Sequence, residues 1–141
     1  MDQRISAITL GVADVNRARA FYERLGWKAT SASDDNVAFF QMNGCALCLF
    51  PTKALAKDAG VERPGAGFDN VTLSFNVDTQ AQVKATLAKA KKAGGTILRD
   101  AGAVFWGGFT GYFADPDGHA WEVAHNPFWK LDKKGNVKLP K

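Results

Sequence analysis

The sequence predicts an α+β fold made of two βαβββ-like modules, each of them a sheet with a helix on one face. The main observation is a repeated order along the 141-residue chain. In both halves, a run of alternating apolar and polar residues leads into a capped helical pattern. Shorter strand-like runs follow each helical pattern. This duplication favours two similar sheets with one helix each.

The first module is predicted over residues 5–50. Its opening strand, residues 5–12, alternates between apolar and small or polar side chains. Asp14 then offers a side-chain cap for a helix over residues 15–25, and Gly26 supplies the C-terminal stop. Further strands are expected around residues 27–30, 36–42 and 45–50.

The second module is predicted over residues 70–125 and repeats this order. Residues 71–77 alternate as a strand, and Thr79 with Gln82 forms a capping box for the next helix. That helix is expected to end at Gly94-Gly95, because glycine commonly follows the last helical turn. Further strands are expected around residues 96–99, 109–114 and 119–124.

We interpret residues 1–141 as a single domain in which a loop joins the modules and a tail follows them. Residues 51–69 form the inter-module loop. A loop of this length is more often functional than idle; the alternative is a simple linker, and the two interpretations do not exclude each other. Residues 126–141 form a lysine-rich tail. In this tail, Phe128 and Trp129 are expected to pack on the body of the protein or on a partner subunit.

Composition is ordinary for a globular protein, with 46% hydrophobic and 23% charged residues. There is no signal-peptide pattern and no long apolar run, so we expect a cytoplasmic protein without a membrane partner. The net charge is +4. Its lysines gather on one predicted helix and in the tail, away from the aromatic residues, so a nucleic-acid partner is not expected. The charge is compatible with anionic small ligands.

Cys45 and Cys48 have the spacing of a redox or metal-binding pair. Redox pairs of this spacing lie at a helix N-terminus, whereas this segment has a strand pattern. A zinc site would need two further ligands from a second pair. We therefore expect two buried, unpaired thiols.

The turn sequence Asp115-Pro116-Asp117-Gly118 leads into a strand that carries the most informative polar residue, Glu122. Alternation puts its bulky neighbours on one face of the strand and Glu122 on the other. A carboxylate in that place must be solvated, hydrogen-bonded or bound to a ligand. Glu122 is therefore a candidate for a network with Thr72 or Ser74, or for a general acid or base; we favour the network or a ligand contact.

Several short motifs occur along the chain in a set order: Leu10-Gly11-Val12-Ala13-Asp14, Ala20-Phe21-Tyr22, Leu25-Gly26-Trp27, Phe75-Asn76-Val77-Asp78, Trp106-Gly107-Gly108-Phe109 and Asp115-Pro116-Asp117-Gly118. In this order, over residues 5–127, the chain resembles the vicinal oxygen chelate superfamily, which groups glyoxalase I, bleomycin-resistance proteins and extradiol dioxygenases. The resemblance implies paired βαβββ modules whose mixed sheets curve around a ligand cavity, commonly in a homodimer.

Members of this superfamily that use a metal hold it with four cavity-facing side chains, typically histidines and glutamates. The resemblance places these positions at Ala7, Cys48, Thr72 and Glu122. Only Glu122 matches, and one carboxylate cannot hold a divalent ion against water. No cofactor and no tightly bound metal are therefore expected. His119 and His125 fall on the strand face opposite Glu122 and are expected to be structural or surface residues, not ligands.

The strand faces that the helices leave free would form the wall of the cavity. Small and hydroxyl-bearing side chains on this wall, and aromatic side chains at its rim, are candidates for ligand contacts. The predicted ligand-binding residues are Thr9, Cys48, Thr72, Ser74, Trp106, Tyr112 and Glu122.

The resemblance and the missing metal ligands together predict a metal-free protein that binds a small molecule. The alternative is a glyoxalase-like lyase or isomerase with an atypical metal site that includes Glu122. An extradiol-type dioxygenase is less favoured, because it needs an iron triad. The sequence leaves open whether the cavity forms within one chain or across a dimer.

Overall fold

The computed structural model describes residues 7–59 and 71–138. The chain divides into two compact units, residues 1–69 and 70–141. The start of the first predicted strand, most of the predicted inter-module loop and the last three residues of the tail lie outside the described residues.

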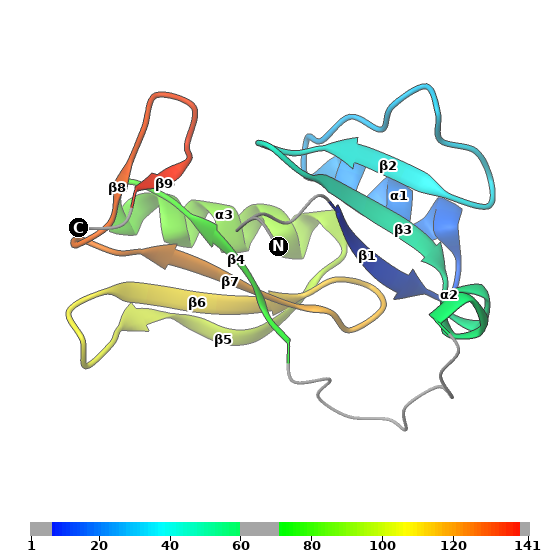
Figure 1. Ribbon diagram of the computed structural model, residues 1–141. Coiled ribbons are helices and arrows are strands. Elements are labelled where there is room, and N and C mark those ends of the chain that lie inside the picture. Colours follow the sequence, from blue (N-terminus) through cyan, green and yellow to red (C-terminus); the bar gives the residue numbers. More distant parts are fainter. Residues whose placement is uncertain (1–6, 60–70, 139–141) are drawn as a thin grey trace. The chain divides into compact units, whose positions relative to one another are not determined.

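In its described residues, 7–59, the first unit contains a three-stranded sheet and two helices (Figure 1). Its elements are β1 (Ala7–Val12), α1 (Val15–Arg24), β2 (Ala38–Gln41), β3 (Ala46–Pro51) and α2 (Thr52–Ala59). The strand order is β1-β3-β2, with β1 parallel and β2 antiparallel to β3. The strand predicted around residues 27–30 is reduced to one antiparallel bridge between Ala29 and Phe40.

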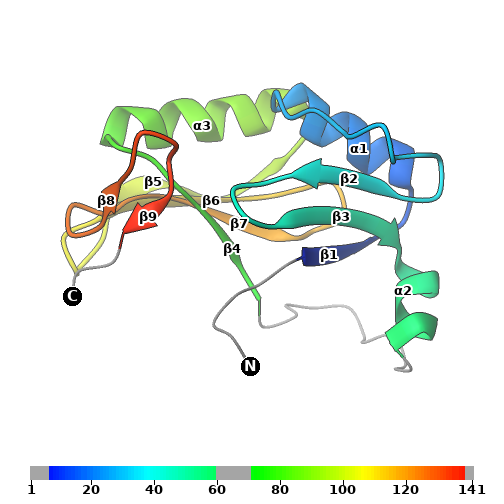
Figure 2. The same cartoon turned by 45° about the horizontal axis from the view of Figure 1, so that its top comes forward.

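Helix α1 forms where its cap and its apolar stripe predict it. The Asp14 carboxylate accepts a hydrogen bond of 2.9 Å from the backbone N–H of Arg17. The helix buries Val15, Ala18, Phe21 and Tyr22, and Figure 2 shows it lying along one face of the sheet. The apolar side chains of the first unit therefore gather between α1 and this sheet.

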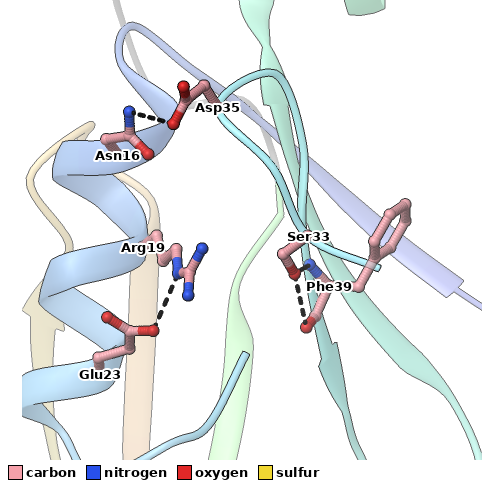
Figure 3. Close-up of polar contacts among 6 residues, drawn as sticks. All are labelled: Asn16, Arg19, Glu23, Ser33, Asp35 and Phe39. Carbon is pink, nitrogen blue, oxygen red and sulfur yellow. Dashed lines mark hydrogen bonds and ion pairs between the residues drawn. The ribbon is translucent and has the colours of Figure 1, made fainter. Parts of the chain in front are cut away.

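Hydrogen bonds stabilise the connection between α1 and β2, and Figure 3 shows them. Asn16 of α1 donates a hydrogen bond of 3.1 Å to the Asp35 carboxylate. The Ser33 hydroxyl accepts a bond of 2.9 Å from the backbone N–H of Phe39 and lies 3.5 Å from the carbonyl oxygen of that residue. On the helix itself, Arg19 pairs with Glu23 at 2.9 Å.

The second unit contains a complete βαβββ module, which confirms the predicted fold class. Its elements are β4 (Leu73–Asn76), α3 (Gln80–Ala93), β5 (Thr96–Ala103), β6 (Phe109–Ala114) and β7 (Ala120–His125), followed by the short strands β8 (Lys130–Leu131) and β9 (Val137–Lys138). The sheet order is β4-β7-β6-β5; β4 is parallel to β7, and the other pairs are antiparallel.

Helix α3 covers one face of this sheet (Figure 2). The predicted capping box is present, because the Thr79 side chain accepts from the backbone of Gln82 and the Gln82 side chain accepts from the backbone of Thr79. The helix ends at Gly94, whose φ of 108° lies in the left-handed region. Its apolar side chains pack over Gly111 of β6, where a Cβ atom would overlap Leu87 Cδ1. Within the described ranges, none of the helices is long and apolar enough to cross a membrane.

Both cysteines are free thiols, as predicted. Cys48 on β3 is buried as predicted. Cys45 lies just before this strand and is half-buried, so the prediction that both thiols are buried is wrong for Cys45. Phe128 of the tail packs its ring over Gly107, with 3.5 Å between a Cβ built there and Phe128 Cζ. The ring nevertheless stays largely exposed.

Candidate functional site

The turn between β6 and β7 sets the register of the candidate site. The backbone N–H of Gly118 donates to the carbonyl of Asp115 at 3.0 Å, and Gly118 has the positive φ of 91° that favours glycine. The buried Asp115 carboxylate accepts from the backbone N–H groups of Asp117 and His119 and lies 2.7 Å from His119 Nδ1. His119 therefore has the structural role near the turn that its position in the sequence predicts.

This register aligns four polar side chains across the second sheet. Ser74 of β4 pairs with Glu122 of β7, which pairs with Tyr112 of β6, which in turn pairs with Arg99 of β5. We call these four residues the Glu122 row. The neighbouring pair on β6 and β7, Phe113 and Trp121, points to the opposite face. There both rings are buried and stacked on each other. The Glu122 row therefore lies on the face away from α3.

Two hydroxyl groups hold the Glu122 carboxylate. Ser74 Oγ donates to Glu122 Oε2 at 2.8 Å, and Tyr112 Oη donates to Glu122 Oε1 at 3.1 Å. An ionised carboxylate has about four acceptor positions. Among the described residues Ser74 and Tyr112 are its two donors, so the half-buried Glu122 keeps acceptor positions for a ligand.

Arg99 completes the row as its cation. Its guanidinium carbon lies 5.2 Å from the centroid of the Tyr112 ring, which is within the range of a cation–π contact. A terminal nitrogen of Arg99 donates to Thr110 Oγ1. Thr110 is the next residue of β6 on the same face and is buried. Arg99 is thus supported by one ring and one hydroxyl while it remains exposed.

A bulge in β5 brings Arg99 to this face. Ile97 pairs with Phe113 on the helix side, and Arg99 pairs with Tyr112, the neighbour of Phe113. A step of two residues along β5 therefore corresponds to a step of one residue along β6, which is a β-bulge. Because of this bulge, Arg99 lies on the face opposite Ile97. Plain alternation would have placed both side chains on the same face. This is why Arg99 is not among the residues predicted from the sequence. Thr110 is not among them either, although alternation along β6 places it on the same face as Tyr112.

The surroundings of Tyr112 favour its protonated form, which is the form that donates a hydrogen bond. Partial burial raises the pKa of Tyr112 above its ordinary value of 10.0. The charge of Glu122 and the hydrogen bond to it raise this pKa further, whereas the charge of Arg99 lowers it. The phenol therefore stays protonated at neutral pH and keeps donating to Glu122.

Of the seven predicted ligand-binding residues, the structure joins Ser74, Tyr112 and Glu122 by hydrogen bonds. Thr72 is exposed and precedes β4, so the hydroxyl that bonds Glu122 from this segment belongs to Ser74. Trp106 lies in the turn between β5 and β6, where its ring covers Gly108.

The other two predicted residues belong to the first unit. Thr9 of β1 pairs with Cys48 of β3, so these side chains are neighbours on one sheet face. By alternation with the buried Leu10, this face is the one away from α1. Thr9 is exposed and Cys48 is buried.

The donor set of the Glu122 row does not fit a divalent metal. It offers one carboxylate, a serine hydroxyl and a phenol that stays protonated, and the cationic Arg99 lies in the same row. Divalent ions need several carboxylate or imidazole donors. Over residues 7–59 and 71–138, no three side chains of His, Cys, Asp or Glu come together as a group that could hold a metal ion.

Comparisons with solved structures support the fold over the whole chain. A glyoxalase-related enzyme from Fulvimarina pelagi is 37% identical, with a TM-score of 0.87 and 99% of each chain covered. A hypothetical protein from S. aureus is 24% identical, with a TM-score of 0.77 and 89% of this chain and 95% of that chain covered. A lactoylglutathione lyase from Agrobacterium tumefaciens is 21% identical, with a TM-score of 0.68 and 92% and 98% covered.

No sequence among the curated proteins matches the chain. A family model does match, over residues 4–123, and its description is Glyoxalase/Bleomycin resistance protein/Dioxygenase superfamily. This match takes in both units and ends at β7, one residue beyond Glu122. The chain therefore belongs to the Glyoxalase/Bleomycin resistance protein/Dioxygenase superfamily.

Proposed function

We propose that this protein binds a small molecule on the face of the β4-β7-β6-β5 sheet that carries the Glu122 row, and that it does so without a metal. The observation that carries the proposal is the pair of hydrogen bonds from Ser74 and Tyr112 to the two oxygens of Glu122. Binding sites place a few oriented polar groups on a rigid scaffold. A sheet with three polar side chains joined across adjacent strands has this character.

The arrangement favours binding over a purely structural role because it is both oriented and accessible. Ser74 is exposed, and Tyr112 and Glu122 are half-buried, so solvent or a ligand can reach the row. Side chains that are already held in place lose little further conformational entropy when a ligand binds.

The proposal that no metal takes part rests on donor chemistry. The superfamily resemblance places metal ligands at Ala7, Cys48, Thr72 and Glu122, and an alanine side chain offers no donor atom. We further propose that the protein acts as a homodimer, in line with the common assembly of the superfamily.

The experiment that tests binding is a screen of small polar metabolites against ¹⁵N-labelled protein, read by chemical-shift changes of backbone amides. We expect hits to shift amides of β4, β6 and β7 around the Glu122 row. Glu122→Gln should keep the fold and weaken these hits about tenfold, because an amide accepts with one oxygen and loses the charge. Asp78→Asn is the matched control, since it removes one exposed carboxylate just before α3.

The proposal is wrong if hits leave the amides of the Glu122 row unchanged, or if Glu122→Gln and Asp78→Asn weaken them equally. A well-dispersed spectrum of the Glu122→Gln variant is required in either case, because it separates loss of binding from loss of fold.

A second candidate is a glyoxalase-like lyase or isomerase. It is favoured by the likeness to the Fulvimarina pelagi protein, which is described as a glyoxalase-related enzyme. In this function Glu122 would accept a proton from a carbon next to a carbonyl group and return it elsewhere on the substrate. Formation of S-lactoylglutathione from methylglyoxal and glutathione, lost in Glu122→Gln, would favour this candidate over simple binding.

A further inference from the structure

We propose that the ligand of the Glu122 row carries a carboxylate group that Arg99 binds, together with a hydrogen-bond donor that Glu122 binds. This inference rests on the proposed function and names the chemical class of its ligand. The class is a small organic acid with a hydroxyl or amino group several bonds from the carboxylate.

Arg99 is free to bind an anion. Among residues 7–59 and 71–138 it forms no ion pair with a carboxylate, and its one hydrogen-bond partner is Thr110. A guanidinium group has five N–H donors, so most of its donor capacity is directed at solvent. The planar fork of arginine matches the two oxygens of a carboxylate.

The guanidinium is also held in place before any ligand arrives. Its central carbon lies 5.2 Å from the centroid of the Tyr112 ring, and one of its nitrogens donates to the buried Thr110 hydroxyl. An arginine that served only solubility would need neither contact, because a mobile side chain is solvated equally well. A fixed orientation lowers the entropy that a ligand must remove on binding.

The row presents opposite charges at two separated points. Glu122 lies on β7 and Arg99 on β5, with β6 between them, so their backbone positions are about 10 Å apart at the usual strand spacing. Because Tyr112 lies between them, the two charges do not neutralise each other in an ion pair. A ligand that places its carboxylate over β5 and its donor over β7 complements both.

The test compares 6-hydroxyhexanoate with its uncharged amide, 6-hydroxyhexanamide, and with hexanoate, which lacks the hydroxyl donor. Each probe is titrated into the full-length ¹⁵N-labelled protein, and both backbone amides and arginine Nε–H signals are followed. We expect the acid to bind roughly tenfold more tightly than the amide, with a shift of the Arg99 Nε–H signal. Hexanoate should keep the Arg99 shift and lose the shifts around Glu122.

Variants assign the effect to Arg99. Arg99→Gln should reduce the affinity for 6-hydroxyhexanoate about tenfold and leave the affinity for the amide unchanged. Lys92→Gln removes the same charge from an exposed position on α3, which covers the other face of the sheet, and should change neither. If Arg99→Gln does not fold, the Nε–H shift in the unmodified protein still decides the question.

The inference is overturned if acid and amide bind equally, if neither binds, or if Lys92→Gln weakens the acid as much as Arg99→Gln does. Equal binding of acid and amide with shifts around Glu122 would overturn the role of Arg99 and leave the proposed function standing. The proposed function itself fails only through the metabolite screen and its Glu122→Gln and Asp78→Asn controls.

Discussion

Tyr112 links the charge of Glu122 to the charge of Arg99, and its protonation state governs the Glu122 row. While it is protonated, the phenol donates to Glu122 and offers its ring to Arg99. Once it is ionised, it cannot donate, and its negative charge lies beside that of Glu122. The row is therefore intact only on the acid side of the Tyr112 titration.

We expect this titration to be visible as a pH-dependent loss of stability. The folded pKa of Tyr112 is raised above the unfolded value of 10.0. The resulting stabilisation is fully present below about pH 10 and is lost as the pH rises through the folded pKa. The difference in free energy of unfolding between the unmodified protein and Tyr112→Phe should therefore shrink above about pH 10.

Tyrosinate absorbance measures the same group directly. The chain has two tyrosines, so the difference between the unmodified protein and Tyr112→Phe reports Tyr112 with Tyr22 as a common background. Titration of Tyr112 at or below the ordinary value would contradict the arrangement that we describe.

At the same scale, the sequence predicted a network between Glu122 and Thr72 or Ser74, and the structure has the hydrogen bond from Ser74. Alternation placed Ser74 and Glu122 on this face because it holds in β4 and β7. It could not predict Arg99. The bulge that turns this side chain over arises from the pairing of β5 with β6, and that pairing depends on residues far along the chain.

Among the elements, α3 and β6 show how closely the helix approaches the sheet that carries the site. A Cβ atom on Gly111 would overlap Leu87 Cδ1 and lie 3.1 Å from the backbone of Arg99 and Ala101. A glycine is therefore needed here for close packing, and this position fixes the distance between α3 and the sheet.

We expect Gly111→Ala to lower the free energy of unfolding by about 1–3 kcal/mol, because the added methyl group overpacks the buried contact with Leu87. Gly102→Ala on β5 is the matched control, since a Cβ atom there meets nothing within 4 Å. It should be neutral or stabilising by up to about 1 kcal/mol. Urea unfolding followed by tryptophan fluorescence compares the two variants, and equal destabilisation would refute this account of the packing.

Most elements were predictable because their signals are local. The caps at Asp14 and Thr79 and the glycine at position 94 mark helix ends whichever way the chain folds later. The prediction of a strand around residues 27–30 was wrong because strand pairing is not a local property. The pairing of this segment is limited to the bridge between Ala29 and Phe40, and an alternating pattern does not reveal how many partners a strand will find.

For the molecule as a whole, the duplication was visible in the sequence, and both units pair their first strand in parallel with their last sheet strand. The match of the family model over residues 4–123 agrees with this organisation. The ligand was not predictable, because proteins of one fold carry out different functions through different side chains.

Metal retention is the prediction that belongs to the whole chain, because the four positions that the resemblance assigns come from both units. After metal-free protein is dialysed against zinc, nickel, manganese or anaerobic ferrous iron, elemental analysis should find far less than one ion per chain. Glu122→Ala should give the same result. Retention of close to one metal ion per chain that disappears in Glu122→Ala would contradict the metal-free proposal. It would favour the lyase or isomerase function instead.

The irregular β5 has a consequence beyond the site, because it is an outer strand of its sheet. Outer strands expose backbone groups that can recruit a strand from another molecule and start aggregation. The register shifts between Ile97 and Gly102 break the even spacing that such a recruit would need. A substitution that straightened β5 would thus turn Arg99 away from the proposed ligand site and, at the same time, make the protein more prone to aggregate. The proposed recognition by Arg99 and the solubility of the protein would then depend on the same bulge.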